Sequence, residues 1–246
     1  MTTSLAQIWR YPIKAIGAEP LDRVALTEGR PLPLDRAWAV LEEGGDASLG
    51  WRSCRNFLRG AKGPSLMSVT AETKGDALHL THFDRPELVI TLAETSAEAL
   101  IEWLRPIYPD SRQQPVSLVK SPDEGMADVP FASVSVMSLS SLQAVSEKAG
   151  QDLDVRRFRG NIWLDGLAPW AEFDLVGKTL SIGDVTLEVL EPITRCRATE
   201  ANPKTGQRDI NTLQVLEQNF GHSEFGMNTK VVTGGDIAVG NSVVIL

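Results

Sequence analysis

Short runs that alternate apolar and polar residues, each bounded by glycine or proline, recur along most of this chain. Residues 6–11 alternate in this way before Pro12, and residues 21–27 do so before a turn at residues 28–31. A period of two is typical of strands with one buried face, and proline ends such runs because it cannot donate to a strand ladder. The sequence therefore predicts a fold made mainly of short strands.

Three stretches instead carry apolar residues at helical spacing. Serine or threonine precedes the first two and glycine follows the last two, as expected for helix caps. The predicted helices are Thr95–Leu104, Leu139–Ala149 between Ser138 and Gly150, and Leu213–Phe220 before Gly221. We expect a mostly β protein with a few helices, of the α+β class.

Two further strand predictions depend on turn residues and proline. Leu66–Thr70 and Ala77–Thr81 are predicted to form a hairpin joined by residues 73–76. Val185–Leu190 is predicted to be a strand that Pro192 stops.

The composition excludes several classes of protein. With 42% hydrophobic and 23% charged residues in 246, the chain is globular rather than disordered. A net charge of −8 disfavours nucleic acid or an anionic membrane as a partner, although a local basic pocket is compatible with it. Two cysteines and three histidines are too few for a Cys-ligated iron–sulfur cluster or for a closed zinc site beside another function.

We find neither a targeting segment nor a common catalytic motif in the sequence. The first residues carry no signal-peptide pattern and no apolar run approaches membrane length, so we expect a cytoplasmic protein without a membrane partner. The phosphate-binding, dinucleotide-binding, zinc-protease and serine-hydrolase motifs do not occur.

Cys196 stands out because it lies between Arg195 and Arg197, just before the turn Asn202–Gly206. Fixed positive charge favours thiolate, the form that attacks electrophiles or binds metals. A small buried apolar residue is an equally good interpretation of a free cysteine. A disulfide with Cys54 is the third alternative, although two unpatterned thiols fit a reducing compartment better, and we expect Cys54 to be free and dispensable.

Two other groups of polar residues have open interpretations. Basic residues gather in residues 50–64, and we expect a solvated face there. Ser133 and Ser135 precede the N-terminus of the second predicted helix, where they would either bind an anion or form an ordinary strand–helix joint.

Several motifs, taken together and in order, resemble the MOSC family, which includes the mitochondrial amidoxime-reducing component. They are Tyr11-Pro12-Ile13-Lys14, Asp35-Arg36, Phe158-Arg159-Gly160-Asn161, Arg195-Cys196 and Asn202-Pro203-Lys204-Thr205-Gly206. The resemblance implies a MOSC-type β-barrel packed with an N-terminal β-barrel module. We place the module at residues 1–114 and the MOSC domain at residues 115–246.

The resemblance also implies a molybdenum cofactor, Mo-molybdopterin, with Cys196 as thiolate ligand to molybdenum. It assigns cofactor contacts to Lys14, Arg36, Ser133, Arg159, Asn161, Thr194 and Arg195, and a catalytic, proton-carrying role to His222 beside Cys196. Family members are also associated with pyridoxal phosphate binding. Asn228 stands where relatives often have tyrosine, so a contact made by that ring is in doubt.

The implied function is an oxidoreductase that reduces small N-hydroxylated compounds. Because the chain has no iron–sulfur or flavin motif, electrons would come from a separate donor protein of ferredoxin, flavoprotein or cytochrome type. The alternative is a carrier of molybdenum cofactor or of sulfur, held as a Cys196 persulfide, without turnover of its own.

Overall fold

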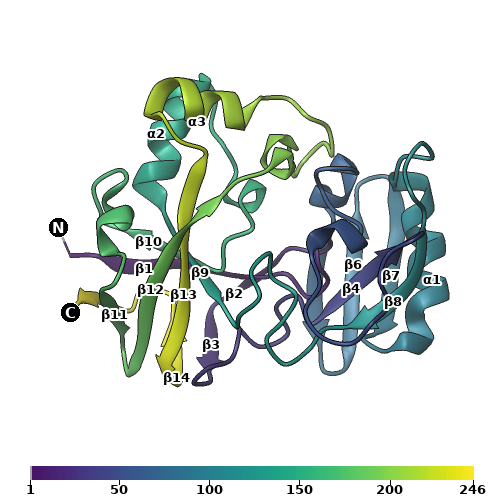
Figure 1. Cartoon of the computed structure of the whole chain (residues 1–246), viewed down its shortest axis with the longest axis horizontal. Helices are drawn as coiled ribbons and strands as arrows, with labels where there is room; N and C mark the ends of the chain where they lie inside the picture. Colours follow the sequence, from purple (N-terminus) through teal and green to yellow (C-terminus); the bar gives the residue numbers. More distant parts are fainter. Residues whose placement is uncertain (1) are drawn as a thin grey trace.

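The computed structural model describes residues 2–246 and arranges them in two lobes (Figure 1). The larger lobe is built on an eight-stranded sheet with the order β15-β11-β12-β13-β9-β10-β1-β2. Neighbouring strands are antiparallel except β9 and β10, which are parallel. Its strands are β1 (Ser4–Arg10), β2 (Glu19–Leu21), β9 (Val134–Ser138), β10 (Ile162–Asp165), β11 (Thr179–Ile182), β12 (Val185–Thr194), β13 (Glu224–Thr233) and β15 (Val243–Ile245).

Smaller sheets complete the fold. A two-stranded sheet of β3 (Arg23–Leu26) and β14 (Gly235–Ala238) belongs to the larger lobe. The smaller lobe holds one two-stranded and one three-stranded sheet. Its strands are β4 (Trp38–Glu42) with β8 (Pro115–Lys120), and β5 (Thr70–Lys74), β6 (Ala77–His82) and β7 (Arg85–Thr91).

The three predicted helices are present, and local capping explains their limits. They are α1 (Ala97–Leu104), α2 (Leu139–Ala149) and α3 (Thr212–Phe220). The Ser138 side chain accepts a hydrogen bond from the Ser141 N–H at the start of α2, and Gly150 ends it in the left-handed conformation. Helix α1 lies in the smaller lobe, whereas α2 and α3 pack together on the larger one (Figure 1).

Each lobe has its own apolar core. The larger lobe buries residues such as Leu5, Val136 and Leu187 between its strands, and the smaller lobe buries Ile13, Leu58 and Leu104. A third cluster, around Phe158, Trp163 and Phe225, fills the space beneath α2 and α3. Ile13 belongs to the core of the smaller lobe although β1 belongs to the larger, so the segment after β1 connects the two.

Two predicted strands differ from the structure. Leu66 lies in a short 3-10 helix, Pro64–Ser68, because Pro64 favours a first helical turn, and the hairpin pairs β5 with β6 instead. Pro192 does not stop β12, which continues to Thr194. The register shifts on both sides of Pro192, and such irregularities tolerate a residue that cannot donate.

The predicted class, mostly β with a few helices, is confirmed. No sheet formed by residues 2–246 closes into a complete barrel. The division at residues 114 and 115 stays a proposal. Strand β8 follows that boundary and pairs with β4 of the smaller lobe, while β1 precedes it and pairs with β10 of the larger.

No helix within residues 2–246 is both long enough and apolar enough to cross a membrane.

Candidate functional site

Two adjoining cavities bring together residues from both lobes. The polar cavity has a volume of about 340 Å³ and includes Ser133, Ser135, Asn161 and Asn228 in its wall. The cysteine cavity, of about 240 Å³, includes Lys14, Cys54 and Cys196. The two share the wall residues Arg36, Asp128, Arg159, Ile193, Thr194 and Arg195. We refer to the two cavities together as the cleft.

Cys196 lies just beyond the end of β12, where the chain leaves the sheet for a short turn, Arg197–Glu200. The residue is exposed to solvent in the cleft, and its thiol is free. Although the residue as a whole is exposed, the cavity walls partly desolvate its sulfur, and this raises the pKa of the thiol more than the Ala198 N–H and Arg195 lower it. The positive charge of Arg195 therefore does not lower the pKa of this thiol overall. Arg197 is exposed and pairs with Glu200 at 3.0 Å.

Arg36 and Arg159 both lie against the buried ring of Tyr11. Their guanidinium carbons are 5.2 and 4.1 Å from the ring centroid, and the Arg36 Nη2 donates to the Arg159 carbonyl oxygen at 2.9 Å. Arg36 also pairs with the Asp35 carboxylate. Arg159 has no carboxylate partner within residues 2–246, and its one hydrogen bond, from Nη2 to the Ile13 carbonyl, is long at 3.4 Å. Burial, followed by repulsion from Arg36, lowers the Arg159 pKa to about 10.

The backbone at these positions is strained. Arg36 and Arg159 have φ of 50° and 49°, and Ala15, in the same cavity wall, has φ of 65°. Left-handed conformations are costly for residues with a Cβ, and they persist where surrounding structure enforces them, often at functional sites. Because three such residues lie in one cavity wall, we infer that their strained backbone serves to place the two guanidinium groups.

Arg195 is a second half-buried arginine, and its hydrogen-bond partners are neutral groups. Its Nη1 donates to the Phe158 carbonyl at 2.9 Å, and its Nε donates to the Phe225 carbonyl at 2.7 Å. Burial, with a smaller contribution from Arg36, lowers its pKa to about 9. Gly226 permits this packing, because a Cβ there would lie 2.0 Å from the Met137 sulfur, which itself contacts Arg195.

Lys14 is buried and has an acidic partner. Its Nζ donates to the Asp128 Oδ1 at 2.5 Å and to the Met126 carbonyl at 2.7 Å. The Lys14 ammonium holds the pKa of Asp128 below its ordinary range. Charges therefore balance at Lys14 and Arg36, whereas Arg159 and Arg195 leave the cleft with positive charge that no carboxylate pairs.

The remaining predicted contacts lie mainly in the polar cavity. Ser133 is buried there, and Thr194 is exposed where the two cavities meet. Asn161 also lines it but is held by protein groups. Its Oδ1 accepts from the Ser135 N–H and Oγ at 3.1 and 2.8 Å, and its Nδ2 donates to the Trp9 carbonyl at 3.2 Å. Asn228, in place of the family's tyrosine, donates to Glu191 at 3.3 Å.

His222 does not line either cavity. Its ring lies against Trp170 and Phe173, with centroids 4.8 and 5.2 Å apart, and its Nδ1 is 3.8 Å from a Glu224 carboxylate oxygen. A proton-carrying role for His222 stays a prediction.

Several wall residues were not predicted as site residues, among them Asp128, Arg59 and Cys54. Asp128 lies in a polar loop without a motif, and Arg59 and Cys54 belong to the segment expected to be a solvated face. Arg52 of that segment is also buried, against the Phe57 ring. The apolar residues Phe57 and Leu58, both fully buried, were the local signal that this segment enters a core.

Comparison with known proteins gives the family. A model of the MOSC N-terminal beta barrel domain matches residues 2–104, and a model of the MOSC domain matches residues 124–244. The chain belongs to the MOSC-domain proteins. Among its relatives, mitochondrial amidoxime-reducing component 1 of Homo sapiens is 22% identical, with 99% of this chain and 83% of that protein aligned.

The molybdenum cofactor sulfurase of Caenorhabditis briggsae is 25% identical over 87% of this MOSC-domain chain, which spans only 31% of the sulfurase. Among solved structures, the YuaD protein of Bacillus subtilis aligns over 100% of this chain and 96% of its own, with a TM-score of 0.51 and 10% identity. At this identity the likeness shows a shared fold.

The cleft of this MOSC-domain protein fits an anionic, metal-bearing cofactor. Arginines partly withdrawn from water without a carboxylate partner carry a desolvation cost, and a phosphate or dithiolate would offset that cost with charge-assisted hydrogen bonds. No group of three or more His, Cys, Asp or Glu side chains suited to a metal ion occurs among the described residues. A metal held by Cys196 would thus need its other ligands from a cofactor, and a dithiolene supplies soft sulfur ligands of that kind.

Proposed function

We propose that this protein binds molybdenum cofactor in the cleft and reduces small N-hydroxylated compounds. The observation that carries the proposal is the position of Cys196 beside Arg159 and Arg195, two half-buried cations without a carboxylate partner among residues 2–246. Family relationship to amidoxime-reducing components and cofactor sulfurases supports the same cofactor.

Different residues of the cleft would contact different parts of the cofactor. Lys14, Arg36 and Arg159 would hold the cofactor phosphate, for which a guanidinium offers two parallel hydrogen bonds. Ser133 and Thr194 would add hydroxyl contacts, and Arg195 would balance the charge of the dithiolene. Cys196 would ligate molybdenum through its sulfur and release its proton on binding.

Molybdenum held in this way supplies the two-electron chemistry that removes oxygen from nitrogen, while the protein supplies ligation and orientation. A separate protein would deliver the electrons, because the sequence contains no iron–sulfur or flavin motif. The second candidate, a carrier of cofactor or sulfur, is favoured by the exposure of Cys196, which leaves its sulfur accessible.

Turnover separates the two candidates. Protein loaded with molybdenum cofactor is given a chemical reductant and an aromatic amidoxime, and formation of the amidine is followed. The proposal predicts turnover by wild type and its loss in Cys196→Ser that has been shown to be folded. Cofactor binding without turnover would favour the carrier, and neither binding nor turnover would refute both.

A further inference from the structure

The two cysteines of the chain line the same cavity although they are far apart in sequence. Cys54 begins a 3-10 turn, Cys54–Asn56, in the smaller lobe, and Cys196 precedes the turn Arg197–Glu200 of the larger lobe. Both thiols are free. Two segments that are unrelated in the sequence therefore meet at this cavity.

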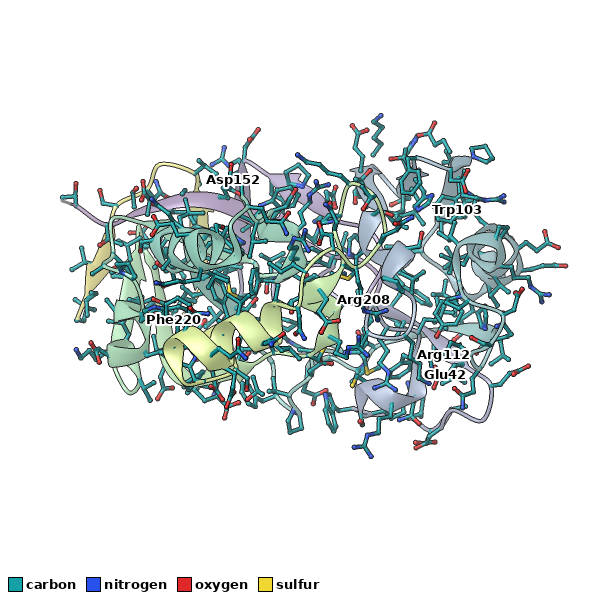
Figure 2. All side chains as sticks on the ribbon, turned by 90° about the horizontal axis from the view of Figure 1, so that it is seen from above. Glu42, Trp103, Arg112, Asp152, Arg208 and Phe220 are labelled. Carbon is teal, nitrogen blue, oxygen red and sulfur yellow. The ribbon has the colours of Figure 1, made fainter. Side chains whose placement is uncertain are left out.

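The walls that carry the two cysteines touch each other. A Cβ on Gly60 would lie 3.3 Å from the Ala198 Cβ, so the backbone at Gly60 lies close to the turn that follows Cys196. Close by, the Arg208 Nη2 donates to the Ala61 carbonyl at 2.6 Å. Figure 2 shows Arg208 near the middle of the molecule, between the lobe with Phe220 and the lobe with Trp103. Contact on this side of the cleft keeps the turns of the two cysteines near each other.

The two thiols differ in their access to solvent and in their charged neighbours. Cys196 is exposed in the cavity, where a small oxidant can reach it, and Arg195 lines the same wall. Cys54 is half-buried and receives a contact from the Arg59 Nη1 at 3.8 Å from its sulfur. An accessible cysteine next to a second thiol is the arrangement that turns a sulfenic acid into a disulfide.

We infer that Cys54 is the resolving thiol for Cys196 when no cofactor holds the Cys196 sulfur. Cys196 thiolate attacks hydrogen peroxide, breaks the O–O bond, and becomes a sulfenic acid while hydroxide leaves. Cys54 thiol then attacks that sulfur, the S–O bond breaks, and water leaves as the disulfide forms. The two thiols lose two electrons in total, and one peroxide molecule takes them.

The disulfide would link the two lobes across the cysteine cavity. It would remove the sulfur proposed as metal ligand, and it would also protect Cys196 from irreversible sulfinic and sulfonic acids. A small thiol would reverse it by thiol–disulfide exchange. This modification goes beyond the proposed reductase function and does not depend on it.

The test uses cofactor-free full-length protein treated with hydrogen peroxide and digested without reductant. Cleavage after glutamate suits the sequence, because trypsin would cut on both sides of Cys196, at Arg195 and Arg197. It should release residues 44–72 with Cys54 and residues 189–200 with Cys196. Mass spectrometry should find these two peptides joined after peroxide and separate after dithiothreitol.

Cys54→Ser and Cys54→Ala, checked for folding, should instead accumulate sulfinic and sulfonic acid at Cys196. Mixing ordinary and ¹⁵N-labelled wild type distinguishes a bond within one chain from a bond between chains. The inference is overturned if the peptides do not join, if they join only between chains, or if the variants and wild type over-oxidise Cys196 equally.

Discussion

Replacing Arg159 tests the cationic part of the cleft. In the structure its guanidinium stacks 4.1 Å from the Tyr11 ring centroid and donates one long hydrogen bond, 3.4 Å, to the Ile13 carbonyl. Most of its donors are therefore available to an anion. Arg159→Lys keeps the charge and loses the fork that binds two phosphate oxygens, whereas Arg159→Ala loses both.

Two effects of the substitution can be estimated, one on cofactor retention and one on the free energy of unfolding. A charge-assisted hydrogen bond contributes roughly 1.5–3 kcal/mol, so Arg159→Ala should weaken cofactor retention about ten- to hundredfold, and Arg159→Lys should weaken it less. The lowered Arg159 pKa, about 10, corresponds to a penalty of about 3 kcal/mol for the buried charge. Alanine removes that penalty along with a stacking interaction of about 2 kcal/mol. The free energy of unfolding of cofactor-free protein should then change by only about 1 kcal/mol.

The assay is pterin content after dialysis, with urea unfolding of the cofactor-free protein measured in parallel. Arg156→Ala is the matched control, because Arg156 is engaged by Asp154 at 2.6 Å and lines neither cavity. It should retain pterin as wild type does. Equal retention by Arg159→Ala and Arg156→Ala would refute the placement of the anion site. Unfolding of Arg159→Ala that accounted for its loss of pterin would contradict the predicted small change in stability.

Two further predictions concern stability. Burial raises the pKa of Glu172, so the folded state binds that proton more tightly, and stability should fall as pH rises from about 4.3 through the raised value. Glu172→Gln should flatten this dependence in urea unfolding at several pH values, and an unchanged slope would contradict it. Asn161→Ala should cost about 1–3 kcal/mol because it leaves the buried Ser135 N–H without its acceptor. A free energy of unfolding from calorimetry within about 0.5 kcal/mol of wild type, the range of neutral surface substitutions, would contradict this prediction.

The sequence predicted a helix correctly where the residues that begin and end it are its immediate neighbours. Ser138 and Gly150 bound α2 because a cap acts within one turn of the helix. Local signals were not enough at Pro192 in β12. Whether a proline is tolerated there depends on the irregular register with β13, a strand distant in the sequence.

The site could be predicted only in part. Arg36, Arg159, Arg195 and Cys196 belong to motifs, and the structure brings them into one cleft. The position of Cys54 in that cleft depends on how the two lobes pack, which no local pattern reports. The pKa of Cys196 depends on how far the cavity walls desolvate its sulfur, which neighbouring charges in the sequence do not report.

The central claim is that Cys196 holds molybdenum in this cleft, and metal analysis tests it most directly. Wild type and Cys196→Ser are expressed in a host that makes molybdenum cofactor and are analysed freshly purified. The account predicts near-stoichiometric molybdenum and pterin in wild type, and little molybdenum in folded Cys196→Ser because an alkoxide is a poorer soft-metal ligand. Wild type without molybdenum and pterin, or a folded variant with undiminished molybdenum, would contradict it.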